Sequence, residues 1–252
     1  MLEKKTKNKT LKKCLILLFL ALIFSVVLFI MYKYHVEGEK NIPFSITKLI
    51  TISSAETEDL EQNDGLYQAN IVQNNDIFIA IEKNKNYSKE DSIKSITFNN
   101  FNIIKQGSVG KIKIYRTSEE QKKYKYSENY EMKDSIEYLG DLNTNLKMEK
   151  MTIANQGGLL EFSIILDELG KITYEDNENI TSDGTLLNRL NLSHEDIKTS
   201  ISFDMIIKLN SGNTFKTTIY LELPCGNILE DGVCTTENYS LDKLVYKRVT
   251  ND

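Results

Sequence analysis

The chain has 252 residues, with 31 Lys and Arg against 36 Asp and Glu, and its 40% hydrophobic content is that of ordinary globular protein. This composition excludes a mainly disordered chain, and the presence of only two prolines excludes a long proline-rich stalk. The tail 1–13 carries +5, and because the whole chain carries −5, residues 33–252 carry −10. So acidic a domain repels phosphate backbones, and we expect no nucleic-acid binding.

Residues 1–13 form a basic tail, and the stretch that follows, Cys14–Tyr32, is a run of 19 residues without charge, Gly or Pro. As a helix rising ~1.5 Å per residue it measures roughly 28 Å, close to the ~30 Å hydrocarbon core of a bilayer. It is longer than the apolar run of a cleaved signal peptide, and no small-residue cleavage site follows it. We therefore predict a retained transmembrane helix that contacts the lipid bilayer through Cys14–Tyr32.

The lysine-rich tail predicts the orientation of this helix, because positive flanks stay on the cytoplasmic side of a membrane. We expect a cytoplasmic N-terminus, a single-pass cell-membrane protein and an extracytoplasmic C-terminal domain. Residues 33–43 then form a short juxtamembrane collar, and residues 44–252 form the domain, which we expect to lie close to the bilayer surface.

The domain is predicted to be mainly β. The strongest signal is a hairpin, in which alternating runs at 203–209 and 215–223 flank the turn Asn210–Asn213. A turn is also expected at Asn99-Asn100, and a last strand over Leu241–Val249. Further strands are predicted at 44–54, 77–81, 96–98, 101–103, 112–114 and 160–166. About ten strands with little helix favour an antiparallel β-sandwich, with a jelly-roll-like topology as one option.

The most polar part of the domain is Ser118–Asp134, which is dense in Glu, Lys and Tyr. It suits either a short helix that begins at Ser118 or a loop. Tyrosine offers a large contact area with a polar tip, so Tyr124, Tyr126 and Tyr130 are candidates for an interaction surface. The alternative is a solvated insert whose rings pack on the sheet.

Two cysteines bracket the turn-rich stretch Gly226–Val233. Outside the cytoplasm the setting is oxidising, so Cys225 and Cys234 are predicted to form a disulfide that stabilises this loop. Free thiols or metal-binding thiols are the alternatives; zinc needs further ligands, and no histidine lies nearby in the sequence. The disulfide would have no catalytic role.

Two polar stretches are candidate sites of chemistry. The acidic stretch Tyr174–Asp183 has oxygen ligands that suit calcium but does not match an EF-hand loop, so a solvated loop is the other interpretation. Ser193–Lys198 begins with a capping pattern for one helical turn, which contains His194 beside two acids. No nucleophile elbow, P-loop, dinucleotide fingerprint or zinc-protease motif occurs. We therefore expect no catalytic residue, no cofactor, no metal and no enzyme activity.

Three segments, together with the basic tail and its span, carry a resemblance: Ile42–Glu56, Ala154–Ile164 and Ser182–Leu190. In these the chain resembles signal-anchored, single-pass membrane proteins of low-GC Gram-positive bacteria that have no assigned function. The resemblance implies a bacterial plasma-membrane protein with an exposed domain. It implies no site residue and no activity.

The function expected from the sequence is binding: an anchored β domain that recognises a partner protein or a cell-envelope component. The alternative from another class is an anchored hydrolase that cleaves cell-surface glycan through two carboxylates.

Overall fold

The computed structural model describes residues 2–63, 65–87, 90–116, 130–140, 151–175, 185–237 and 241–249. Strands make up most of the domain, which confirms the mainly β prediction. In chain order the elements are α1 (Leu2–Glu37), β1 (Phe44–Asn63), β2 (Leu66–Lys83), β3 (Ile93–Gln106), β4 (Lys111–Arg116), β5 (Ser135–Gly140), β6 (Met151–Ile153), β7 (Gly157–Glu175), α2 (Thr185–Arg189), α3 (His194–Ile197), β8 (Thr199–Leu209), β9 (Thr214–Leu223), α4 (Ile228–Asp231), β10 (Val233–Glu237), the 3-10 helix η3 (Leu241–Lys243) and β11 (Lys247–Val249).

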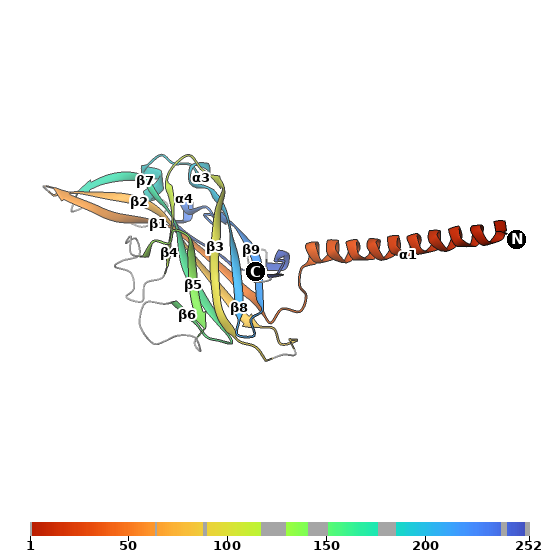
Figure 1. The fold of residues 1–252 in the computed structure, drawn as a ribbon. Coiled ribbons are helices and arrows are strands. Elements are labelled where there is room, and N and C mark those ends of the chain that lie inside the picture. Colours follow the sequence, from red (N-terminus) through yellow and green to blue (C-terminus); the bar gives the residue numbers. More distant parts are fainter. Residues whose placement is uncertain are drawn as a thin grey trace.

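The N-terminal helix projects away from the domain (Figure 1). Within the described part of the chain, one helical stretch, Lys12–Glu37, is long and apolar enough to cross a membrane, and none of its most apolar window is buried in the protein. The helix continues past the predicted end of the span at Tyr32 and takes in the first residues of the collar. An exposed apolar helix of this length is suited to association with a lipid bilayer.

The strands form two sheets. The first has the order β10-β1-β2-β7-β4, and the second has the order β11-β9-β8-β3-β5-β6. All pairs are antiparallel except β5 with β6. The expected hairpin is present as β8 and β9, whose register runs from Thr199 opposite Leu223 to Lys208 opposite Thr214.

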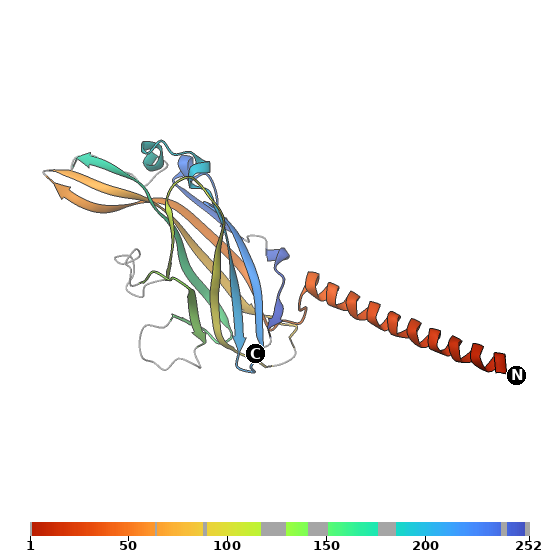
Figure 2. The same ribbon diagram turned by 45° about the horizontal axis from the view of Figure 1, so that its top comes forward.

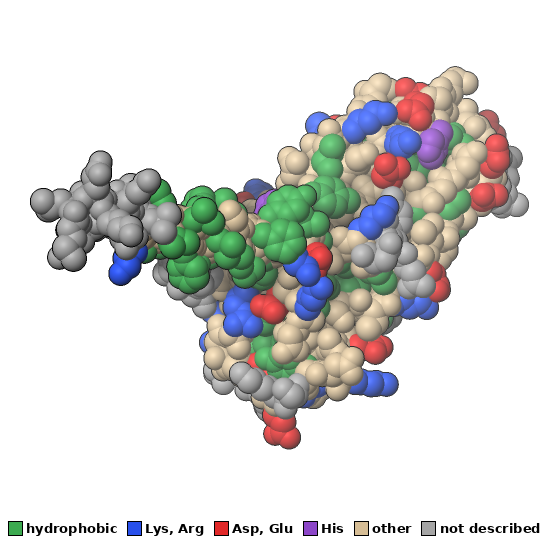
Figure 3. Space-filling view, turned by 90° about the vertical axis from the view of Figure 1, so that its right-hand side faces the viewer, with side chains coloured by type: hydrophobic (Ala, Val, Ile, Leu, Met, Phe, Trp, Pro, Cys, Tyr) green, Lys and Arg blue, Asp and Glu red, His purple; other side chains and the backbone are tan. Residues whose placement is uncertain are grey.

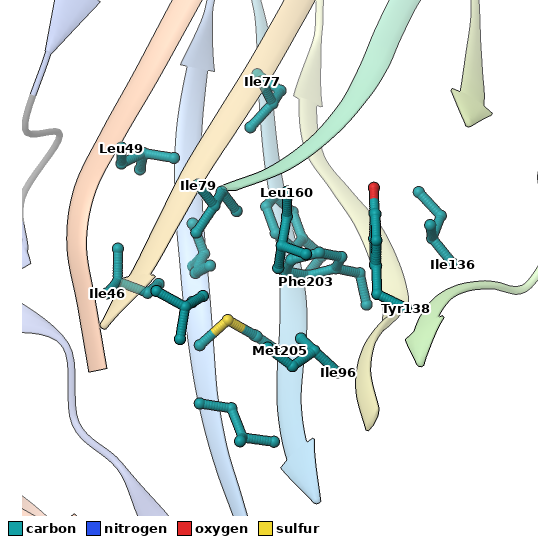
Figure 4. Close-up of a cluster of buried hydrophobic side chains, with 14 of the residues drawn as sticks. Ile46, Leu49, Ile77, Ile79, Ile96, Ile136, Tyr138, Leu160, Phe203 and Met205 are labelled. Carbon is teal, nitrogen blue, oxygen red and sulfur yellow. The ribbon is translucent and has the colours of Figure 1, made fainter. Parts of the chain in front are cut away.

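Side chains from both sheets meet in one hydrophobic core (Figure 4). Ile77, Ile79 and Leu160 come from the first sheet, and Phe203 and Met205 come from the second; all five are buried. The rings of Phe162 and Phe203 pack edge to face, with their centroids 5.5 Å apart. Successive side chains of a strand point to opposite faces of its sheet, so residues two apart in the sequence lie on the same side.

A smaller hydrophobic cluster lies where the first sheet extends beyond the main core. The far ends of β1, β2 and β7 project as an arm on the side opposite to α1 (Figure 1, Figure 2). Helices α2, α3 and α4 cover the base of this arm with the buried residues Leu186, Leu187, Ile197 and Ile228. Leu186 and Leu187 lie on the short helix α2.

Two local expectations differ from the structure. The expected turn at Asn99-Asn100 is a bulge inside β3, where Asn100 has φ of 53° and the register to β8 shifts. Its side-chain amide donates to Asp204 of β8 at 2.7 Å, which links β3 to β8 at the bulge. The expected last strand is mostly η3 and coil, and pairing is confined to β11, because the buried ring of Tyr246 turns the chain into the core and its hydroxyl accepts the Ile46 amide at 3.0 Å.

Candidate binding face

The side of the first sheet that faces away from the core carries an organised set of polar side chains. Along β2, Ile77 and Ile79 enter the core, so the alternating positions Asn74 and Asp76 lie on the opposite side. We call this side the outer face. It comprises Ser54, Glu56, Glu58, Asn70, Val72, Asn74, Asp76, Lys113, Tyr115, Ser163, Ile165 and Asp167.

One part of the outer face is a chain of hydrogen bonds across three strands. Ser54 donates to Oε1 of Glu56 at 2.9 Å, and the amide of Asn74 donates to the same oxygen at 3.0 Å. That amide also donates to Asp76 at 3.1 Å, and Ser163 donates to the second oxygen of Asp76 at 2.6 Å. These side chains hold one another, so the two carboxylates occupy fixed positions.

A second part is centred on Asp167. Its Oδ2 lies 2.6 Å from Lys113 Nζ, and its Oδ1 accepts from Asn70 at 3.0 Å and from the Glu168 backbone amide at 2.7 Å. Burial raises the pKa of Asp167, but Lys113 and the other donors outweigh it and leave the pKa below its usual value. The pKa of Glu58 is raised, first by burial and then by the charge of Asp167.

An aromatic island lies between the polar groups. Val72, Tyr115 and Ile165 are buried together on the outer face, and Tyr130 packs against them. The guanidinium of Arg116 sits 5.2 Å from the centre of the Tyr130 ring, within cation–π range. Burial raises the pKa of the Tyr115 hydroxyl above its ordinary value.

Of the three tyrosines predicted to form an interaction surface, the structure describes one, and that one lies on the outer face. Tyr124 and Tyr126 lie outside the described residues, as does Ser118. Tyr130 is described and belongs to the aromatic island, and its neighbour Glu131 bridges to Tyr115. Arg116 and Tyr130, the two described residues on either side of this segment, both lie at the aromatic island.

The predicted disulfide pair lies at the edge of the first sheet. Cys225 follows β9 and Cys234 lies in β10; both thiols are free and partly buried. The Cys225 thiol donates to the carbonyl oxygens of Cys234 and Thr51, each at 3.3 Å. Burial, followed by the nearby Asp231 carboxylate, raises the pKa of the Cys234 thiol. The structure thus brings the two residues together, and the disulfide stays a prediction.

The other polar candidates are used structurally where they are described. Asp196 receives hydrogen bonds from Ser108 and from the side chain and backbone of Ser193, which lower its pKa to about 2. It therefore caps α3, as the sequence pattern predicted. Most of the acidic stretch Tyr174–Asp183 lies outside the described residues. Among the residues that are described, no group of three or more His, Cys, Asp or Glu is arranged to hold a metal ion.

Sequence reasoning missed the outer face, although β2 contains a signal for it. Four consecutive polar residues, Gln73–Asp76, separate the apolar pair Ile71-Val72 from the apolar run Ile77–Ile81 in this strand. Gln73 and Asn75 lie on the inner side, where Asn75 accepts from Ser53 at 2.7 Å and donates to the Ile164 carbonyl at 2.9 Å. Such a run in a strand indicates polar partners on both sides, because buried polar side chains are stable only when hydrogen-bonded.

Comparison of this chain with family models, curated proteins and solved structures gave no match.

Proposed function

We propose that the protein is a single-pass membrane protein whose extracytoplasmic β-sandwich binds a partner protein or a cell-envelope component through the outer face. The orientation rests on the basic tail before the span. The assignment of a β-sandwich is supported by the single hydrophobic core that the two sheets share.

The observation that carries the proposal is the fixed hydrogen-bond chain of the outer face. Four carboxylates of Glu56, Glu58, Asp76 and Asp167 face one lysine there, so the surface is acidic. Because hydrogen bonds from neighbouring side chains already hold Glu56, Asp76 and Asp167, little of their conformational entropy is lost when a partner binds. An acidic, pre-organised face beside aromatic rings suits a partner that presents amines or hydroxyl groups.

Crosslinking of the tagged full-length protein in its own membranes, read by mass spectrometry, tests this function. Glu131→Lys reverses a charge beside the aromatic island, and we expect it to abolish capture of a reproducible partner. Glu137→Lys is the matched control, because Glu137 is exposed on β5 in the other sheet. Absence of any partner under efficient crosslinking, or equal capture by both variants, contradicts the protein-binding form of the proposal.

Binding of an envelope polymer is tested separately. The purified full-length protein is mixed with isolated envelope polymers, and both retention and cleavage are measured. Retention that Glu131→Lys removes and Glu137→Lys preserves supports polymer binding. Release of soluble fragments instead indicates a hydrolase.

One observation favours that second candidate, a glycan hydrolase. Glu58 lies close enough to Asp167 for the Asp167 charge to raise the Glu58 pKa, and two neighbouring carboxyl groups are what a glycosidase uses. Against it, both oxygens of Asp167 already accept hydrogen bonds from protein donors. Loss of fragment release in Glu58→Gln would establish the hydrolase and overturn the binding function.

A further inference from the structure

The end of the membrane helix is docked on the second sheet beside β11. Tyr34 accepts a hydrogen bond from the Arg248 backbone amide at 2.9 Å, and Lys247 Nζ lies 3.3 Å from His35 Nδ1. The Glu39 amide donates to the Tyr246 carbonyl at 2.6 Å. These contacts fix the last turns of the helix against the domain, at the level where the bilayer headgroups lie if the helix spans the membrane.

A groove beside this junction is lined by basic side chains. Figure 3 looks at the face from which the helix leaves and shows lysine and arginine around its base, with carboxylates between them. The charged and titratable lining of the groove is His35, Lys216, Lys243, Lys247 and Arg248. The exposed ring of Tyr220 also lines it.

Not all of these cations are neutralised. Lys216 is paired with Asp204 at 2.7 Å, and Arg248 with Glu39 at 3.5 Å. Lys243 and Lys247 have no ion pair with a carboxylate in the part of the chain that the structure describes. Two ammonium groups are therefore left to attract an anion, in a domain whose net charge is strongly negative.

The basic groove is continuous with an apolar one. Lys247 and His35 also line a second groove, whose other walls are the helix residues Leu28, Ile30 and Met31 with two tyrosines. The lining thus changes from aliphatic to aromatic to cationic along the helix toward the domain. A phospholipid has the same sequence of groups, from its acyl chain through the interface to its phosphate.

We propose that this juxtamembrane groove binds an anionic phospholipid from the leaflet on the domain side. The phosphate lies between Lys243 and Lys247, and an acyl chain lies against Leu28, Ile30 and Met31. The site requires the membrane-spanning helix, but it is independent of the partner that we propose for the outer face.

Native mass spectrometry of the full-length protein in mild detergent tests this site. The probes are phosphatidylglycerol and phosphatidylcholine, which share acyl chains and differ in net charge. We expect the wild-type protein to bind phosphatidylglycerol preferentially. Lys243→Ala together with Lys247→Ala removes both unpaired charges and should weaken that binding at least about tenfold.

Two further variants separate charge from folding. Arginine at both positions retains the charge and should retain the preference. Lys133→Ala with Lys171→Ala is the matched control, because it removes two exposed lysines that line neither groove. Circular dichroism of each variant confirms that the β domain is intact.

The outcomes that overturn the site are specific. Equal binding of the two lipids by the wild-type protein excludes a charge-selective site. Unchanged phosphatidylglycerol binding in the double alanine variant excludes these two lysines. Inorganic phosphate that competes at the concentration of the lipid identifies a soluble-anion site and excludes the lipid assignment.

Discussion

The Nζ atom of Lys113 lies 2.6 Å from Oδ2 of Asp167, and this pair joins β4 to β7 on the outer face. The Asp167 side chain is 15% exposed, and the Lys113 side chain is 31% exposed. The pair is therefore sheltered enough to stabilise the sheet and is not a fully solvated surface contact. It also places a positive charge among the carboxylates of the outer face.

Asp167→Asn should lower the free energy of unfolding by about 1–2 kcal/mol at pH 7, because it removes the charge of this pair. The pKa of Asp167 is lowered in the folded state, so its contribution is present above the unfolded pKa and is lost as the pH falls through the folded pKa. The difference between wild type and variant should therefore shrink below about pH 4. Urea unfolding of the full-length protein in detergent, followed by tyrosine fluorescence because the chain has no Trp, measures it.

Glu58→Gln should raise the free energy of unfolding, which is the opposite of the effect expected for Asp167→Asn. The pKa of Glu58 is raised by burial and by Asp167, so its ionised form is disfavoured in the folded protein. A neutral amide removes that cost, and the variant should be slightly more stable than wild type at pH 7. The gain should disappear as the pH falls and the wild-type carboxyl becomes protonated. Destabilisation at pH 7 in the same urea experiment would mean that the carboxylate has a stabilising partner.

Phe162→Ala should lower the free energy of unfolding by about 3–5 kcal/mol, because it opens a cavity where the aromatic rings of both sheets meet. Leu159→Ala on the same strand is the matched control, since Leu159 is 60% exposed and should change stability by less than about 0.5 kcal/mol. Equal effects of the two substitutions on the urea midpoint would show that the shared core is not where the structure has it.

Cys225 and Cys234 lie close together in the structure, and their oxidation state can be predicted from the side of the membrane on which the domain lies. If the domain is extracytoplasmic, Cys225 and Cys234 should be oxidised in protein isolated from its membranes without reductant. Mass spectrometry after maleimide labelling should then find one label, on Cys14, and three labels after reduction. Labelling of all three cysteines before reduction would leave Cys225 and Cys234 as structural thiols.

Membrane orientation is tested by protease treatment of right-side-out cells or vesicles. The basic tail predicts that the β domain is degraded while an epitope at the N-terminus is protected. Inside-out vesicles are the control, in which the two results should be exchanged. Protection of the β domain in intact cells would place it in the cytoplasm and remove the extracytoplasmic part of the proposed function.

The sequence by itself determined the apolar helix, the mainly β composition and the β8–β9 hairpin. These depend on local patterns: an uninterrupted apolar run, alternation with a period of two, and a glycine-containing turn. The cap of α3 was likewise readable, because Ser193 and Asp196 are three residues apart.

Only the tertiary structure decided the outer face and the basic groove, because both combine residues that are distant in the chain. Asp167 meets Lys113 through strand pairing, and Lys247 meets His35 because β11 lies beside the end of the helix. The local pattern at Asn99-Asn100 predicts a turn, because the partner that stabilises the bulge, Asp204, is 104 residues away in the sequence. Local patterns determine which residues form a strand, whereas pairing and packing between distant strands determine which side chains share a site.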